Sequence, residues 1–227
     1  MDKTGVLALV GGSEWTDGCT FDAGLLAASG GSDVVVLPTA AAYQHPERVV
    51  LQAAEWFAPL GAQVQGLMVV DRASADDAGM AATLRGARFI YLSGGSPLHL
   101  KSVLKGSATL AALRAAWAEG AVVAGSAAGA MVLSDPMIDP RGGAFTLGLG
   151  FLDGLAVLPQ FDEERDSGHR QKLERTVALA PTGLALVGIP ARSALIRDTD
   201  GSWRTEGAQA PVIFLNGKET EGLDALG

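Results

Sequence analysis

A run of small residues between two apolar stretches constrains this chain more than any other feature. Residues 122–131 read VVAGSAAGAM, and we interpret them as a buried strand, a tight turn and the start of a helix. Two glycines four positions apart let the backbone turn sharply. This is the pattern of the strand–G-x-S-x-G–helix turn, which exposes a nucleophile at its tip. Gly125 and Gly129 take the glycine positions, so the tip falls on Ala127 and not on Ser126.

Alanine at the tip has no oxygen with which to attack a carbonyl carbon. We therefore expect a hydrolase-like fold whose nucleophile position, Ala127, leaves this chain inactive or very slow. Ser126 lies one position away, where a sharp turn points neighbouring side chains in different directions, so we do not expect it to act as nucleophile. Tight packing of a helix on its strand also selects small residues, and we keep that as the structural alternative.

Apolar strands and helices alternate through the first half of the chain. We expect strands at residues 6–10, 33–37, 63–70, 88–92 and 121–124, and helices at residues 21–29, 46–60, 74–85, 97–104 and 109–119. This alternation predicts a three-layer α/β fold, with a mostly parallel sheet flanked by helices.

The second half changes character. A loop rich in Gly, Pro and Asp is expected at residues 134–154, a charged helix at 165–179 and a frayed tail at 220–227. Short strands at 155–158, 184–189, 193–197, 202–205 and 212–215 predict a smaller antiparallel β portion near the C-terminus.

Length and charge narrow the class of protein. The 227 residues suffice for one α/β domain, and we expect a single domain over residues 1–227. The formal net charge of −8 argues against a nucleic-acid or anionic-membrane surface. Cys19 is the sole cysteine, and no histidine spacing indicates a metal site, so we expect no disulfide, metal or cofactor.

The start of the chain shows no basic segment followed by a long apolar core. No window approaches the roughly 18 uninterrupted apolar residues of a membrane span. We therefore expect no signal peptide and no membrane segment, and by default a cytoplasmic location.

A second glycine-rich turn follows the predicted strand at residues 88–92. Its sequence, Ser93-Gly94-Gly95-Ser96, precedes a predicted helix. Such glycines can bring backbone N–H groups close to a ligand, as an oxyanion hole requires, or can simply form a tight turn. Both readings stay open from the residues alone. In a parallel sheet, this turn and the one at 125–129 converge at the carboxyl edge.

Three histidines and two aspartates are candidate acids or bases. His45 precedes a helix, His99 begins one, and His169 lies in a charged stretch where a solvated position is the simplest reading. Asp135 and Asp139 follow the elbow helix, beside prolines that also suit ordinary turns. A substrate carboxylate could be received by a basic residue, for which the candidates are Arg141, Arg165, Arg170 and Arg192.

Over about residues 5–215 the chain resembles the peptidase E and cyanophycinase family of serine peptidases. The resemblance rests on the two glycine-rich turns and on weaker segments in the family's order. These segments are LALVGG at 7–12, LPTA at 37–40, LGLG at 147–150, PQF at 159–161 and GI at 188–189. It implies a fold like that of class I glutamine amidotransferases, which is flavodoxin-like. It also implies short Asp-containing or β-aspartyl peptides as substrates and, on resemblance alone, a homodimer.

The resemblance also implies roles for individual residues. The family's serine falls on Ala127 and its histidine on Gln160, while Asp139 is the nearest acidic candidate and His169 an alternative base. Oxyanion donors would be backbone N–H groups at the two turns, from Gly94, Gly95 and Ala128. Substrate contacts would come from Ser96, Ser126 and Arg165.

Two explanations of Ala127 fit the sequence. It can be an introduced inactivation of a parent that has serine there, or the chain can be a natural non-peptidase that binds a small peptide or amino-acid-like ligand. Gln160 favours the second explanation, because inactivating an enzyme needs only one change. A glutamine-amidotransferase-like module is a weaker alternative, since the elbow lacks that class's cysteine.

Overall fold

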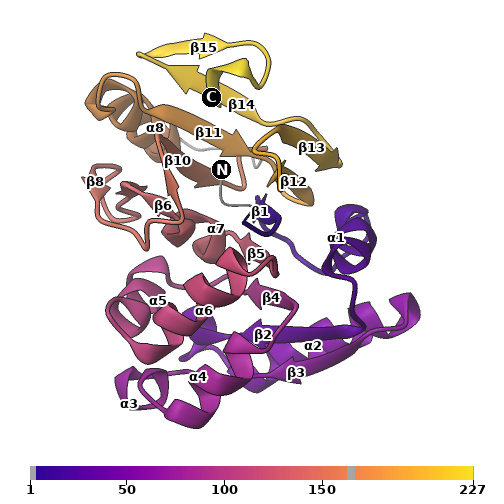
Figure 1. The fold of residues 1–227 in the computed structure, drawn as a ribbon. Helices are drawn as coiled ribbons and strands as arrows, with labels where there is room; N and C mark the ends of the chain where they lie inside the picture. The colour runs from indigo at the N-terminus through magenta and orange to yellow at the C-terminus, as the bar shows by residue number, and fades with distance from the viewer. Residues whose placement is uncertain (1–3, 163–166, 227) are drawn as a thin grey trace.

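A seven-stranded sheet forms the centre of the computed structural model, which describes residues 4–162 and 167–226 (Figure 1). Its strands are β1 (Leu7–Val10), β2 (Asp33–Leu37), β3 (Gln63–Gly66), β4 (Phe89–Leu92), β5 (Val122–Ser126), β12 (Ser193–Arg197) and β13 (Trp203–Gly207). They lie in the order β13-β12-β1-β5-β4-β2-β3. The neighbouring strands β1, β5, β4, β2 and β3 run parallel, whereas β12 pairs antiparallel with β1, and β13 pairs antiparallel with β12. The predicted α/β fold with a mostly parallel sheet is therefore confirmed.

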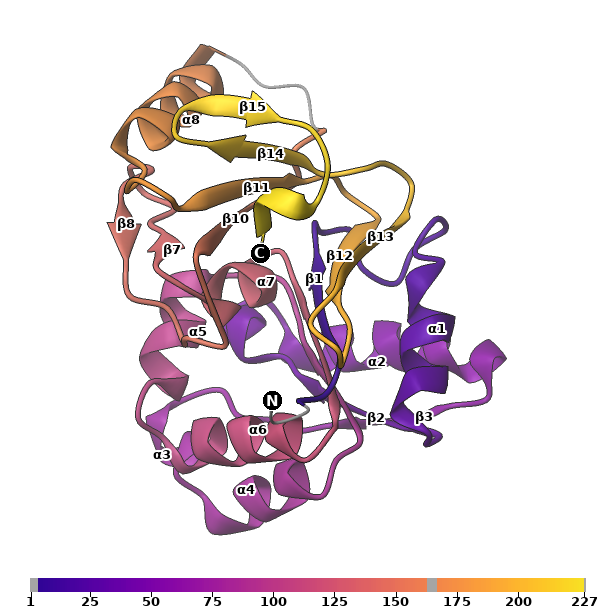
Figure 2. The same cartoon turned by 45° about the horizontal axis from the view of Figure 1, so that its top comes forward.

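Helices cover both faces of this sheet, as Figures 1 and 2 show. One face carries α1 (Phe21–Ser29) and α2 (Pro46–Phe57), and the other carries α3 (Arg72–Ala75), α4 (Ala78–Arg85), α5 (Pro97–Leu104), α6 (Ala108–Ala118) and α7 (Ala128–Leu133). Short 3-10 turns are η1 (Thr39–Ala41), η2 (Ala58–Leu60) and η3 (Asp224–Leu226).

The side chains of β1 point alternately to the two faces of the sheet, which explains why helices cover both faces. Leu7 and Leu9 pack in the core beneath α5, α6 and α7, whereas Ala8 and Val10 pack in the core beneath α1 and α2. All four side chains are fully buried. A strand that is apolar on both sides needs helices on both sides, which is why the continuous apolar runs predicted this arrangement.

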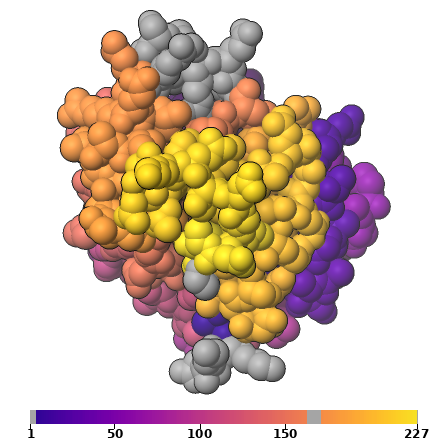
Figure 3. All heavy atoms as spheres, turned by 90° about the horizontal axis from the view of Figure 1, so that it is seen from above, coloured from indigo at the N-terminus to yellow at the C-terminus, as the bar shows by residue number. Residues whose placement is uncertain are grey.

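The C-terminal half adds a second sheet, which covers the middle of the face seen in Figure 3. It consists of β10 (Leu155–Pro159), β11 (Ala185–Ile189), β14 (Val212–Leu215) and β15 (Lys218–Thr220), beside α8 (Ser167–Leu179). β10 and β11 are parallel, and the others pair antiparallel. The predicted strands at 193–197 and 202–205 instead extend the central sheet as β12 and β13.

Two segments predicted to lack structure are ordered by pairing and packing. The loop at 134–154 contains the two-residue strands β6 (Ser134–Asp135), β7 (Met137–Ile138), β8 (Phe145–Thr146) and β9 (Leu152–Asp153). The tail at 220–227 was predicted to fray, but Leu223 and Leu226 pack against the main core and η3 forms there. That prediction was wrong because chain ends are usually exposed, whereas the apolar side chains of this tail find a core surface to pack against.

The predicted helix at 74–85 is two helices, α3 and α4. The Asp71 carboxylate accepts the Ser74 N–H at 2.8 Å and caps α3, while the Asp77 carboxylate accepts the Met80 N–H at 2.8 Å and caps α4. A capping aspartate in the middle of the segment starts a new helix, because its side chain replaces the backbone acceptor of the preceding turn.

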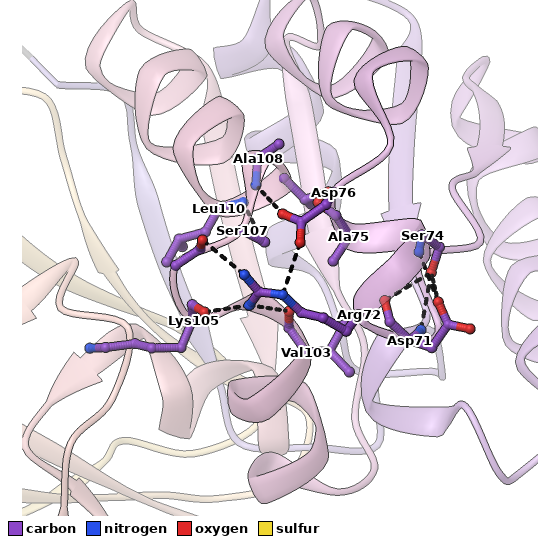
Figure 4. A network of polar contacts seen from close by, with 12 residues as sticks. Asp71, Arg72, Ser74, Ala75, Asp76, Val103, Lys105, Ser107, Ala108 and Leu110 are labelled. Atoms are coloured by element: carbon purple, nitrogen blue, oxygen red, sulfur yellow. Dashed lines mark hydrogen bonds and ion pairs between the residues drawn. The ribbon is translucent and has the colours of Figure 1, made fainter.

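Arg72 fastens α3 to the turn between α5 and α6 (Figure 4). Its guanidinium pairs with Asp76 and donates to the carbonyls of Val103, Lys105 and Gly106. Asp76 in turn accepts the Ala108 N–H at 3.0 Å. This network satisfies carbonyl groups that the end of α5 leaves without intrahelical partners.

Within residues 4–162 and 167–226, each helix falls short of the length and apolar character that a membrane crossing demands.

Candidate active site

The turn between β5 and α7 has the strained geometry that an elbow requires. Ala127 lies at φ 45° and ψ −102°, a conformation that costs a residue with a side chain about 1–3 kcal/mol. Its N–H donates to the Val10 carbonyl at 2.9 Å and its carbonyl accepts the Met131 N–H at 3.0 Å. The surrounding hydrogen bonds therefore fix Ala127 at the tip.

The two glycines of the motif are both required by close approach. A Cβ on Gly125 would lie 2.6 Å from the Gly129 carbonyl carbon, and a Cβ on Gly129 would lie 2.4 Å from the Leu92 carbonyl oxygen. The helix thus packs directly on its own strand and on β4. The sequence left two explanations of the small residues open, close packing of the helix on its strand and a strained turn at Ala127, and the structure has both.

Two further glycines flank the Ala127 methyl group, which is partly exposed. A Cβ placed on Gly12 would lie 3.7 Å from Ala127 Cβ and 3.0 Å from Gln160 Cγ. A Cβ placed on Gly94 would lie 3.6 Å from Ala127 Cβ and 3.1 Å from Glu14 Oε1. Gln160 and Glu14 therefore border the elbow across two neighbouring glycines.

The carboxyl end of β1 organises three residues of this site. The Ala127 N–H donates to the Val10 carbonyl at 2.9 Å. The N–H groups of Gln160 and Arg192 donate to the next two carbonyls of the chain, those of residues 11 and 12, at 2.7 and 2.9 Å. All three donors have positive φ, at 45°, 52° and 58°. Strained backbone gathered at one strand end is typical of a functional site.

Glu14 is a site residue that the sequence analysis missed. Its Oε1 accepts the Gly94 N–H at 2.8 Å and its Oε2 accepts the Ser126 hydroxyl at 2.7 Å. Gly94 was predicted as an oxyanion donor, but Glu14 occupies its N–H. Ser126 is fully buried, so its hydroxyl contacts Glu14 rather than a ligand. The missed signal was an acidic residue two positions after Gly11-Gly12, at the edge where ligands of parallel sheets gather.

The other two predicted oxyanion donors, Gly95 and Ala128, lie after β4 and after β5. Gly95 has an exposed backbone and a φ of 137°, and a Cβ there would lie 2.3 Å from the Ala40 carbonyl oxygen. Ala128 is the first residue of α7, so its N–H has no partner inside the helix. Ala128 directly follows Ala127, and Gly95 is next to Gly94, where a Cβ would lie 3.6 Å from Ala127 Cβ.

Comparison with known proteins gives this geometry a context. The model of peptidase family S51 matches residues 7–202. The chain belongs to peptidase family S51. Cyanophycinases from Synechococcus elongatus and Thermosynechococcus vestitus are each 29% identical to this S51 chain over 193 residues. That match covers 82% of this chain but 60% of each cyanophycinase, so the S51 chain spans about three fifths of their length.

Solved structures agree with the family. A peptidase from an acI-B1 actinobacterium matches the S51 chain with a TM-score of 0.85 and 26% identity, over 96% of this chain and 94% of that one. A peptidase E-like protein from Listeria monocytogenes shares the fold, with a TM-score of 0.70 and 16% identity over 91% of this chain and 100% of that one. The predicted resemblance to peptidase E and cyanophycinase is confirmed.

The predicted acidic residues of the S51 chain have other partners. Asp139 lies between β7 and β8, where Arg141 donates to both of its oxygens, at 3.0 and 2.6 Å. These hydrogen bonds lower the pKa of Asp139 to about 2. Asp135 accepts the Gly148 N–H at 3.3 Å. Both carboxylates therefore stabilise the segment that follows α7.

Ser96 and the three histidines have separate places in the structure. The Ser96 hydroxyl accepts the His99 N–H at 3.3 Å and caps α5, and the His99 ring contacts the Val70 carbonyl at 2.9 Å. His45 is exposed beside Glu47. His169 lies in α8 but its side chain is outside the described part, as is Arg165 altogether. Among the described residues, no group of His, Cys, Asp and Glu could hold a metal ion.

Proposed function

We propose that this S51 chain is a serine-peptidase scaffold for short peptides that contain Asp, through an ordinary or a β-aspartyl linkage, and that Ala127 at the nucleophile position leaves it able to bind them but not to hydrolyse them through an acyl-enzyme. The observation that carries the proposal is the strained tip at φ 45°, which keeps the form of an elbow and presents a methyl group. Loss of such a nucleophile lowers turnover by about 10⁴- to 10⁶-fold in comparable hydrolases.

Gln160 supports the absence of acyl transfer. It borders the elbow across Gly12, and the resemblance aligns it with the family's histidine. A carboxamide does not accept a proton at neutral pH, so it cannot act as a general base. This favours a second candidate function, a natural non-catalytic homologue that binds a small peptide or amino-acid-like ligand.

Arg192 supports an acidic ligand. Its backbone lies beside Gly12, its side chain is exposed, and no ion pair joins it to another of the described residues. A guanidinium at this edge suits the bidentate recognition of a carboxylate. Its aliphatic part crosses Gly18, where a Cβ would lie 3.5 Å from Arg192 Cδ.

The test is to restore the missing groups in two steps. Ala127→Ser and the double variant Ala127→Ser/Gln160→His are assayed on Asp-Xaa and β-aspartyl dipeptides, with the unchanged chain as control. We expect no turnover by the unchanged chain and measurable turnover by the double variant, blocked by a serine-directed fluorophosphonate. No turnover by either variant, combined with calorimetric binding of the peptides, would favour the non-catalytic homologue. Hydrolysis by the unchanged chain would contradict the proposal.

A further inference from the structure

Glu14 is a carboxylate at the edge of the elbow to which the proposed function gives no role. The Gly94 N–H and the Ser126 hydroxyl each donate to one of its oxygens. The side chain is half-buried, and it forms no ion pair with the other residues in the described ranges 4–162 and 167–226. A carboxylate has about four lone-pair sites, so two hydrogen bonds leave room for another donor.

The loop around Glu14 is built to hold that carboxylate in place. Its two neighbours, Ser13 and Trp15, both have positive φ, at 52° and 58°. Trp15 is 4% exposed and its ring centroid lies 5.0 Å from that of Tyr91. The Ser13 carbonyl accepts the Thr16 hydroxyl at 2.7 Å. Two residues with side chains in the left-handed region are uncommon, and here buried packing and hydrogen bonds keep them so.

Glu14 lies where it could contact a positively charged group that the ligand carries next to its carbonyl group. Glu14 Oε1 and Ala127 Cβ both lie against Gly94, since a Cβ there would be 3.1 Å from one and 3.6 Å from the other. In a peptide, the first residue's amino nitrogen is roughly 2.5 Å from its own carbonyl carbon. A carbonyl seated over Ala127 therefore puts a free α-ammonium group within reach of the carboxylate when the amino end of the ligand lies on the Gly94 side.

We propose that Glu14 receives the α-ammonium group of the ligand's first residue, and so selects peptides or amino acids with a free amino terminus. The inference rests on the proposed function, because it needs a ligand carbonyl over Ala127. The donors at Gly94 and Ser126 hold the two carboxylate oxygens in place, and an ammonium group makes a stronger hydrogen bond to a carboxylate than a neutral donor does.

The experiment compares two peptides that differ only at the amino terminus. Isothermal titration calorimetry at pH 7 measures L-aspartyl-L-alanine and its N-acetyl derivative on the full chain and on Glu14→Gln. Glutamine keeps an oxygen to accept the Gly94 N–H but removes the charge. We expect the unchanged chain to bind the free peptide at least tenfold more tightly than the acetylated one. In Glu14→Gln we expect the two affinities to agree within about twofold.

Asp33→Asn is the matched control, because it also removes one negative charge. Asp33 is exposed and begins β2, so it lies at the opposite edge of the sheet from the elbow. This variant should keep the full preference for the free peptide. The comparison of the two peptides on the unchanged chain stands even if Glu14→Gln fails to fold.

The outcomes separate the inference from the proposed function. Equal binding of both peptides by the unchanged chain overturns the role of Glu14 and leaves the proposed function standing. Binding of neither peptide overturns the proposed function, and the inference falls with it. A preference that survives in Glu14→Gln also overturns the inference, since another group would then receive the ammonium.

Discussion

The buried hydroxyl of Ser126 donates a 2.7 Å hydrogen bond to Glu14 Oε2, and so joins the end of β5 to the loop after β1. Glu14 reaches over the neighbouring turn as well, because its other oxygen accepts the Gly94 N–H. One carboxylate therefore connects the loop after β1, the turn after β4 and the end of β5 at the carboxyl edge of the sheet.

We expect Ser126→Ala to lower the free energy of unfolding by about 1–2 kcal/mol, because a hydrogen bond to a charged group is lost. Urea denaturation measures this change. Ser102→Ala is the control, since Ser102 is exposed and, among the described residues, its hydroxyl bonds only within its own helix, to the His99 carbonyl. An equal loss in both variants would show that the contact between Ser126 and Glu14 contributes nothing to stability.

Replacing Ala127 by glycine should stabilise the protein. Glycine adopts a positive φ without the steric cost that Ala127 meets at φ 45° and ψ −102°. We expect Ala127→Gly to raise the free energy of unfolding by about 1 kcal/mol. Ala130→Gly, in the helical part of α7, should instead lower it by about 1 kcal/mol or more. Destabilisation by Ala127→Gly, seen in thermal unfolding, would contradict a strained tip.

The turn at Gly95 should tolerate no side chain. A Cβ there would lie 2.3 Å from the Ala40 carbonyl oxygen, at a φ of 137°. Gly106 also has a positive φ, 72°, but a Cβ there would have nothing within 4 Å. We expect Gly106→Ala to cost about 1 kcal/mol, from strain alone, and Gly95→Ala to cost clearly more. Chemical denaturation of the two variants compares them, and similar costs would mean that the turn relaxes easily.

Stability should depend on pH through Asp22. This carboxyl is fully buried on α1, and burial raises its pKa from 3.8 to about 7, although the Trp56 indole N–H donates to it at 2.9 Å. Between these values the folded state holds a proton that the unfolded state has lost. The stability contributed by this group is therefore complete below about pH 4 and falls as the pH rises toward 7.

The measurement is the free energy of unfolding in urea at pH 5 and at pH 8. We expect the unchanged chain to be more stable at pH 5, and Asp22→Asn to lose this difference while it keeps an acceptor for Trp56. Asp33→Asn, on the surface, should retain the difference. A protein that is equally stable at both pH values would show that Asp22 is ionised in the folded state.

Much of the fold was predictable because the patterns are local. The apolar runs at 33–37 and 193–197 match β2 and β12 residue for residue, and the helices at 21–29 and 97–104 match α1 and α5. The errors came where side chains compete with the backbone or where distant segments meet. Asp77 divides one predicted helix in two, and Ser134–Asp135 pairs with Leu152–Asp153 inside a predicted loop.

The sequence by itself determined the elbow and the residue at its tip. Gly125 and Gly129 are needed for close packing of neighbours along the chain, and such a requirement is written in a short motif. Only the tertiary structure decided which side chains surround Ala127. Glu14 and Gln160 are far apart in the chain, and both lie near Ala127 because of the end of β1. Glu14 belongs to the loop that follows β1, and the N–H groups of Ala127 and Gln160 donate to carbonyls of residues 10 and 11 at that end. Which loops lie side by side at the carboxyl edge depends on the order of the strands in the sheet, and no local pattern of residues specifies that order.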